Sequence, residues 1–154
     1  MSVSAVYDCM IFLQAAANPA RVHSTMRLVE SGKVQLHVSQ DVLAEVRDVL
    51  SRPRHREKFP ALTPENVSEF LEYVARHSRL IDSVPDVYTV ASDPKDSRYV
   101  NLAIAAGATH LVSWDRHLLG LMNLTTAEGA DFRNRFPNLQ VVNPEDFVAM
   151  VANS

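Results

Sequence analysis

Hydrophobic and polar positions change period along the chain, and this pattern predicts alternating strands and helices. Short segments of strand length, mainly apolar or, at Val34–Val38, alternating between apolar and polar residues, occur at Val3–Tyr7, Val34–Val38, Leu80–Val84, His110–Trp114 and Gln140–Val142. Longer stretches with apolar residues three or four positions apart are typical of helices on a sheet: Met10–Ala17, about Pro19–Glu30, Gln40–Leu50, Thr63–His77, Ser97–Ala106 and a helix opening at Asn143. This order predicts an α/β fold with three layers, α/β/α, around a central, mostly parallel sheet of about five strands.

Capping residues support several of these boundaries. Ser39 and the pair Thr63-Pro64 are good helix starts, and Gly32 and Gly107 follow two helices as stops. Three segments lack a clear period and are predicted to be loops or irregular: Arg52–Pro60, Pro85–Lys95 and Gly120–Asn138.

Composition adds bounds to this prediction. With 154 residues, 47% of them apolar, one domain over residues 1–154 is expected. No apolar run reaches the length of a membrane span, and the N-terminus does not resemble a signal peptide. The single cysteine, Cys9, fits a reducing cytoplasm. The net charge of −3 does not point to nucleic acid, although a local basic patch can bind it.

Four acidic residues fall where the predicted strands end and helices begin. Asp8 and Asp115 end two apolar runs, while Glu45 and Asp96 lie near the starts of two helices. In an open α/β sheet these positions meet at one edge. Carboxylates gathered there repel one another and need a cation, and hard oxygen ligands favour Mg²⁺ or Mn²⁺. Each acid alone has an ordinary explanation as an exposed, capping or turn residue. The inference of a cation site therefore depends on all four acids meeting at one edge of the sheet.

Phosphodiester hydrolysis is the chemistry that uses such a group. A divalent ion held by carboxylates lowers the pKa of a bound water, polarises the phosphate and neutralises charge on the leaving oxygen. The six histidines show no metal-ligand spacing, and the four glycines form no phosphate-binding loop. The sequence therefore predicts hydrolysis that needs no side-chain nucleophile.

The spacing and flanks of these acids resemble the PIN domain, a nuclease family that includes VapC-type toxins of toxin–antitoxin systems. The resemblance covers about Val3–Phe147 and rests on four segments: Val6–Asp8, Val38–Val46, Asp93–Tyr99 and Gly107–Asp115. It implies a metal-dependent endoribonuclease that cleaves single-stranded RNA. It also implies a cognate antitoxin protein as partner and a homodimer or higher homo-oligomer.

Carried over by position, the resemblance predicts four catalytic acids: Asp8, Glu45, Asp96 and Asp115. Three of them are predicted to hold the Mg²⁺ or Mn²⁺ ion: Asp8, Asp96 and Asp115. Asp96 is assigned as the third acid because it opens the helix that leads to Gly107-Ala108. Asp93 lies almost one helical turn too early and is predicted to be an accessory acid in an Asp-Pro turn.

The chain departs from the family pattern after the first acid. Asp-Thr-Asn or Asp-Ser-Asn is usual there, whereas this chain has Asp8-Cys9-Met10. Met10 cannot replace the amide, and Cys9 is a weaker polar group than a hydroxyl, so a reduced rate or metal affinity is expected. Trp114 stands where a smaller residue is common, either stacking on a base or serving as a core or rim aromatic.

Basic residues flank the predicted acids. Five arginines are predicted to contact RNA phosphates: Arg47, Arg52, Arg54, Arg98 and Arg116. For Arg47, Arg52 and Arg54, an equally weighted alternative is that they belong to a solvated polar segment that binds no RNA.

Three other functions compete with the nuclease. A catalytically weakened PIN-like interaction module is favoured by Met10. A phosphoacceptor domain of response-regulator type needs an early acidic pair and a late Lys, but Arg116 follows Asp115. A haloacid-dehalogenase-type phosphatase expects Asp-x-Asp at the first strand, which Met10 breaks.

Overall fold

A parallel five-stranded sheet lies at the centre of the computed structural model, which describes residues 3–18 and 23–153. The strands are β1 (Val3–Tyr7), β2 (Val34–Val38), β3 (Ser78–Leu80), β4 (His110–Val112) and β5 (Gln140–Val142). Their order is β3-β2-β1-β4-β5, and every neighbouring pair is parallel. The predicted α/β class with a parallel sheet is confirmed.

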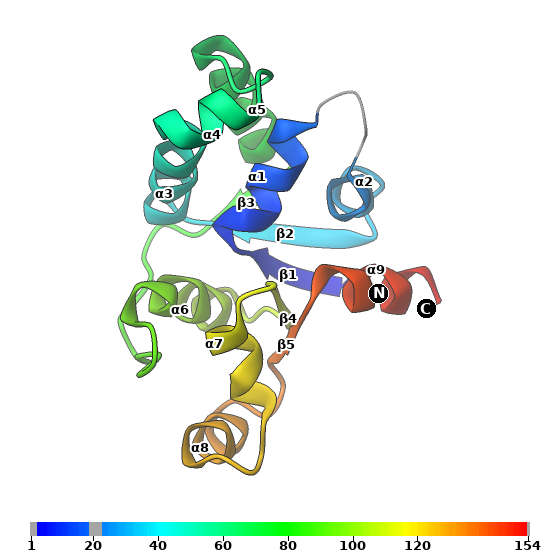
Figure 1. The fold of residues 1–154 in the computed structure, drawn as a ribbon. Helices are drawn as coiled ribbons and strands as arrows, with labels where there is room; N and C mark the ends of the chain where they lie inside the picture. The colour runs from blue at the N-terminus through cyan, green and yellow to red at the C-terminus, as the bar shows by residue number, and fades with distance from the viewer. Residues whose placement is uncertain (1–2, 19–22, 154) are drawn as a thin grey trace.

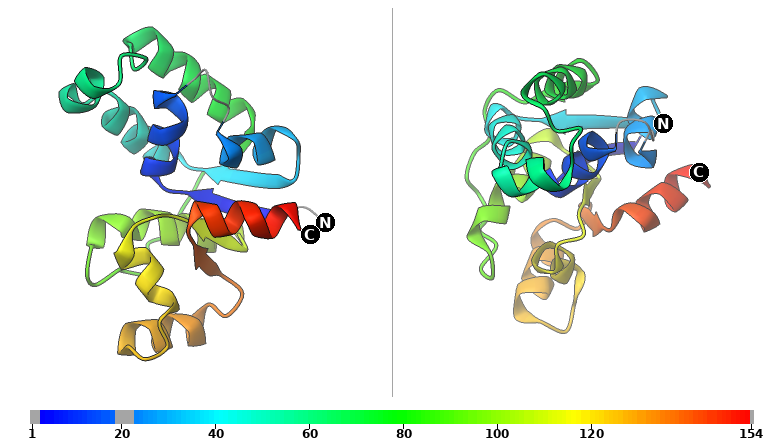
Figure 2. Two further views of the ribbon diagram at one scale, coloured as in Figure 1. Left: turned by 45° about the vertical axis from the view of Figure 1, so that its right-hand side comes forward. Right: turned by 45° about the horizontal axis from the view of Figure 1, so that its top comes forward.

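Helices cover both faces of this sheet. They are α1 (Cys9–Ala17), α2 (Ser24–Glu30), α3 (Gln40–Leu50), α4 (Pro53–Lys58), α5 (Pro64–Arg76), α6 (Ser97–Ala106), α7 (Arg116–Leu119), α8 (Ala127–Arg135) and α9 (Pro144–Ala152), with 3₁₀ turns η1 (Pro94–Asp96) and η2 (Gly120–Met122). Figures 1 and 2 show α1 to α5 on one side of the sheet and α6 to α8 on the other. Within the described residues, no helix has both the length and the apolar character needed to cross a membrane.

The central strand β1 is anchored by aromatic packing. Its last residue, Tyr7, is fully buried, with its ring centroid 6.0 Å from that of Phe12 and 6.1 Å from that of Phe147. The Tyr7 hydroxyl donates to the carbonyl of Thr25 at 2.8 Å, so its polar atom is satisfied inside the core. The end of β1 is therefore held firmly, and Asp8 follows it directly.

The direction of winding reverses between β1 and β4. The chain moves outward from β1 through β2 to β3, then returns across the sheet to β4 on the other side of β1. Such a reversal opens a crevice at the carboxyl ends of the two strands, where α/β proteins bind ligands. The Asp8 amide donates to the carbonyl of Val112 at 3.2 Å, which brings these two strand ends together.

The third predicted strand was placed too late in the chain. It was expected at Leu80–Val84, but β3 spans Ser78–Leu80 and pairs with Leu36–Val38 of β2. This edge strand is largely exposed, so it lacks the pattern of apolar residues from which a strand can be predicted. The amide of Ile81 still bonds to the carbonyl of Val38 at 2.8 Å before the chain leaves the sheet.

The fourth predicted strand was too long. It was expected at His110–Trp114, but β4 ends at Val112. Ser113 turns its side chain into the crevice, and the Trp114 side chain is 47% exposed. The prediction was too long because it counted the exposed Trp114 as part of the apolar strand.

Two segments predicted to be irregular contain helices. The connection Arg52–Pro60 holds α4, which begins with Pro53 and buries none of its residues. The stretch Gly120–Asn138 holds η2 and α8, and α8 buries only Gly129 and Phe132. Neither helix has the apolar stripe on which a prediction from periodicity depends.

The second predicted helix is shorter than expected within the described residues. It was predicted from about Pro19, but α2 begins at Ser24, and residues 19–22 lie outside the described part of the chain. The predicted glycine stops are confirmed. Gly32 has a φ of 79° just after α2, and Gly107 has a φ of 65° after α6. Glycine adopts this left-handed conformation without a steric penalty.

Candidate active site

Asp8 is buried at the switch point between β1 and β4. It caps α1, and its Oδ1 accepts hydrogen bonds from the amides of Met10 at 3.1 Å and Ile11 at 3.2 Å. The residue is only 5% exposed. Burial raises the pKa of Asp8 to about 6 and the charge of Asp115 adds to this, although its hydrogen bonds oppose the rise.

Ser113 links the first and fourth acids. Its buried hydroxyl donates to Oδ2 of Asp8 and accepts a hydrogen bond from the amide of Asp115 at 2.9 Å. Asp115 in turn caps α7, with its Oδ1 accepting from the amide of His117 at 2.7 Å. The first and fourth acids therefore have fixed positions, although residues 8 and 115 lie far apart in the sequence.

Asp96 has the least satisfied carboxylate of the four acids. It lies at the junction of η1 and α6, makes no capping hydrogen bond, and its Oδ2 is buried without a hydrogen-bond partner among the described residues. Burial is the main cause that raises the pKa of Asp96 to about 7. The nearby carboxylates of Asp115, Asp93 and Asp8 raise it further.

Three acids come close enough to share one ion. One carboxylate oxygen from each of Asp93, Asp96 and Asp115 lies within 4.8 Å of the other two, in a search of the described residues. Mg²⁺ binds its oxygen ligands at about 2.1 Å, so the three carboxylates would have to draw closer together to hold one ion. The oxygen donors and the unpartnered Oδ2 of Asp96 together fit a hard divalent cation.

The observed group differs in one member from the predicted ligand set. Asp96 and Asp115 belong to both. Asp93, predicted to be accessory, lies within the group, whereas Asp8 lies behind it and reaches Asp115 through Ser113. The 3₁₀ turn η1 explains the position of Asp93, because the amide of Asp96 donates to the Asp93 carbonyl at 3.1 Å.

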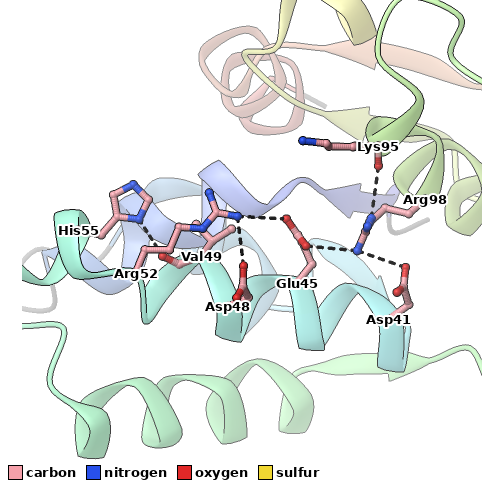
Figure 3. A network of polar contacts seen from close by, with 8 residues as sticks. All are labelled: Asp41, Glu45, Asp48, Val49, Arg52, His55, Lys95 and Arg98. Atoms are coloured by element: carbon pink, nitrogen blue, oxygen red, sulfur yellow. Dashed lines mark hydrogen bonds and ion pairs between the residues drawn. The ribbon is translucent and has the colours of Figure 1, made fainter.

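Glu45 is held by two arginines at the edge of this site. Its carboxylate lies 3.4 Å from Nη1 of Arg98 and 3.9 Å from Nη2 of Arg52 (Figure 3). Arg98 is also 3.4 Å from Asp41, and its Nε donates to the carbonyl of Lys95 at 3.3 Å. Two of the predicted RNA-binding arginines therefore make ion pairs with the protein's own acids.

The other predicted arginines differ in position. Arg116 is exposed on α7, directly after Asp115, and Arg54 is exposed on α4. Arg47 lies two residues after Glu45 and so faces another side of α3. There it lines a small cavity together with Val67 of α5, which places it away from Glu45.

Comparison with known proteins identifies the family. The family model of the PIN domain matches residues 4–117, which include all four predicted acids. The chain belongs to the PIN-domain family. No curated protein matched the chain.

Two solved structures share the PIN fold of this chain at low sequence identity. One is VapBC2 from Rickettsia felis bound to a DNA fragment from their promoter, with 17% identity, a TM-score of 0.53, and 92% of this chain and 98% of that chain covered. The other is PAE2754 from Pyrobaculum aerophilum, with 16% identity, a TM-score of 0.54, and 100% and 98% covered. At these identities the likeness establishes the fold alone.

The residues that depart from the PIN pattern have distinct places. Met10 is 43% exposed and so supplies no buried polar group. Cys9 is partly buried at the start of α1, and burial raises the pKa of its thiol to about 11. Its interaction with the Tyr99 hydroxyl opposes this rise, whereas the charges of Asp8, Glu45 and Asp96 add to it. The thiol therefore stays protonated.

Sequence reasoning did not single out Ser113 or Tyr99 of this PIN domain. Ser113 had a detectable signal, because a small polar residue at the end of a buried parallel strand faces the switch point. No sequence signal marked Tyr99, because an aromatic residue within a helix such as α6 is usually part of the hydrophobic core.

Ser113→Ala is expected to destabilise the PIN domain by about 1–3 kcal/mol at pH 8, because the buried Asp8 carboxylate loses a donor. The free energy of unfolding in urea measures this change. Ser51→Ala, at an exposed position after α3, is the control and should change it little. Equal effects of the two substitutions would show that the bond to Asp8 contributes nothing.

Proposed function

We propose that this PIN domain is a Mg²⁺- or Mn²⁺-dependent endoribonuclease that cleaves single-stranded RNA. The observation that carries the proposal is the convergence of Asp93, Asp96 and Asp115 at the switch point, with Oδ2 of Asp96 unpartnered among the described residues. Carboxylates this close together repel one another, which raises the pKa of Asp96. A bound cation relieves that repulsion.

The protein's own side chains have separate tasks in this mechanism. Asp96 and Asp115 would hold the ion with Asp93, while Asp8 keeps Asp115 in place through Ser113. An ion held there would supply Lewis-acid activation of the phosphate and of water. Glu45 orients the attacking water and accepts its proton, and the cleaved ester oxygen leaves with a proton from solvent.

Arginines near the site are proposed to bind the RNA backbone. Arg98 and Arg116 lie closest in sequence to the acids, and Arg52, the residue before α4, reaches Glu45. Arg54 is exposed on α4, and Arg47, on another side of α3, would contact a more distant part of the strand. Phosphate contacts of this kind fix the position of a strand without reading its bases.

We further propose that the chain, one domain over residues 1–154, is the toxin of a toxin–antitoxin pair in the cytoplasm. The support is its PIN family and a fold like that of VapBC2, which was solved bound to a DNA fragment from its promoter. An antitoxin protein is the partner this implies, and a homodimer or higher homo-oligomer is the expected assembly. Copurification of the toxin with the product of an adjacent short gene tests this part.

A catalytically weakened interaction module is the second candidate. The specific observations in its favour are the exposed Met10 in place of an amide and the ion pairs that occupy Glu45. Such a module would keep the acids and the partner but cleave RNA slowly or not at all.

The deciding experiment is cleavage of mixed single-stranded RNAs with Mn²⁺, with chelator, and with the Asp96→Asn variant. We expect cleavage by the wild-type protein with Mn²⁺ and almost none in the other two conditions. Cleavage that persists equally in the variant and in chelator would contradict the metal-dependent mechanism. Absence of cleavage under every condition would favour the interaction module.

A further inference from the structure

The Tyr99 hydroxyl is buried next to the acidic site without a hydrogen-bond partner of ordinary geometry among the described residues. Tyr99 lies on α6, three residues after Asp96, and is 3% exposed. Its hydroxyl interacts with the Cys9 thiol and is within electrostatic range of Asp8 and Glu45. A thiol is only a weak acceptor, so this buried hydroxyl is poorly satisfied, which destabilises a folded protein and calls for an explanation.

The hydroxyl is a neutral donor under ordinary conditions. Burial raises the pKa of Tyr99 far above its usual value, and Cys9, Asp8 and Glu45 raise it further. An acceptor in this region would therefore gain a hydrogen bond without meeting a second negative charge. Of the two acids that act electrostatically on Tyr99, Asp8 is already bonded to Ser113 and two amides, whereas Glu45 is held only by its arginine ion pairs.

The present partners of Glu45 are easily exchanged. Both Arg98 and Arg52 are partly exposed, and their ion pairs with Glu45 are at 3.4 and 3.9 Å. Exposed ion pairs of this length contribute little to stability. Arg98 points out of the protein from the residue next to Tyr99, and Figure 3 shows it reaching across to α3.

We propose that Tyr99 is a positioning residue for Glu45. When Arg98 leaves Glu45 to bind an RNA phosphate, the Glu45 carboxylate turns inward and accepts a hydrogen bond from the Tyr99 hydroxyl. Successive residues of α6 thus offer Glu45 two alternative partners, Arg98 outside and Tyr99 inside. The catalytic consequence rests on the proposed nuclease function, whereas the exchange of partners does not.

A double-mutant cycle on stability tests the exchange without metal or RNA. Thermal unfolding in chelator is compared for the wild type, Tyr99→Phe, Arg98→Gln and the double variant. In the wild-type background, Tyr99→Phe removes a buried hydroxyl whose neighbour is the weakly accepting Cys9 thiol, and it should leave the melting temperature unchanged or raise it. In the Arg98→Gln background, where Glu45 keeps only the longer ion pair with Arg52, the same change should lower it by about 2–4 °C.

Tyr7→Phe is the matched control for this cycle. The Tyr7 hydroxyl has a fixed acceptor, the Thr25 carbonyl, so its removal should lower the melting temperature equally in both backgrounds. An effect of Tyr99→Phe that is the same in both backgrounds would overturn the proposed exchange. A Glu45→Ala background should abolish the coupling, and coupling that survives there would also overturn it.

RNA cleavage provides the second readout. Tyr99→Phe is expected to lower kcat about tenfold while leaving KM for RNA and the Mn²⁺ requirement unchanged, since it acts only through Glu45. If the wild type is active and Tyr99→Phe leaves kcat unchanged, the proposed role of Tyr99 is overturned, but the nuclease function is not. An inactive wild type would overturn the nuclease function, and the stability cycle would still decide whether Tyr99 and Glu45 pair.

Discussion

Asp96→Asn is expected to slow RNA cleavage about 1,000-fold and to raise the melting temperature of the metal-free protein. Loss of a metal-binding carboxylate removes several kcal/mol of transition-state stabilisation, which corresponds to that factor. The gain in stability has a different origin. The Asp96 carboxylate is partly buried beside other carboxylates, and its Oδ2 lacks a partner among the described residues, so a neutral amide fits the metal-free fold better.

Single-turnover cleavage in Mn²⁺ and thermal unfolding in chelator measure the two effects. Asp131→Asn is the control, because Asp131 is exposed on α8 and pairs only with Arg135 at 3.6 Å among the described ion pairs. It should leave both quantities nearly unchanged. A lower melting temperature for Asp96→Asn would mean that the carboxylate stabilises the metal-free fold, against the expectation.

Without divalent cations, the protein is expected to lose stability as the pH rises from about 4 to about 8. Burial raises the pKa values of Asp8 and Asp96 in the folded protein to about 6 and about 7, from the usual 3.8 of an aspartate. Between these limits the folded protein binds more protons than the unfolded chain, so raising the pH favours unfolding. The contribution is fully present below about pH 4 and is lost as the pH passes through 6 and 7.

Mg²⁺ should restore the stability that the metal-free protein loses as the pH rises, and its effect should grow with pH. The cation binds the ionised carboxylates of the folded protein and stabilises it in proportion to occupancy. Melting temperatures across this pH range, with chelator and with millimolar Mg²⁺, give the measurement. The Asp96→Asn variant should show a weaker pH dependence in chelator. A Mg²⁺ effect as large at pH 5 as at pH 8 would argue against binding by the ionised Asp96 carboxylate.

The sequence contained enough to predict the sheet and where its acids fall. The strands β1 and β2 have a recognisable strand pattern, mainly apolar in β1 and alternating in β2, and parallel strands place their ends at one edge. Asp8 and Asp115 were found because each directly follows such a signal. The family match then confirmed the fold class that this pattern predicted.

What the sequence could not supply depends on exposed elements and on local geometry. The edge strand β3 and the helices α4 and α8 bury few side chains, so no hydrophobic pattern marked their extent. The grouping of Asp93 with Asp96 depends on a 3₁₀ turn, and the ion pairs of Glu45 depend on side-chain directions. Neither can be read from residue spacing.

The exposed Trp114 makes the site observable without a label. It is the only tryptophan in the chain, and the residue that follows it is Asp115 of the carboxylate group. All indole fluorescence therefore originates beside the proposed ion site. Paramagnetic Mn²⁺ bound there should quench this emission strongly, whereas diamagnetic Mg²⁺ should restore it by competition. A base stacking on the ring should shift the emission maximum, so one optical signal can distinguish occupancy by cation from occupancy by nucleic acid.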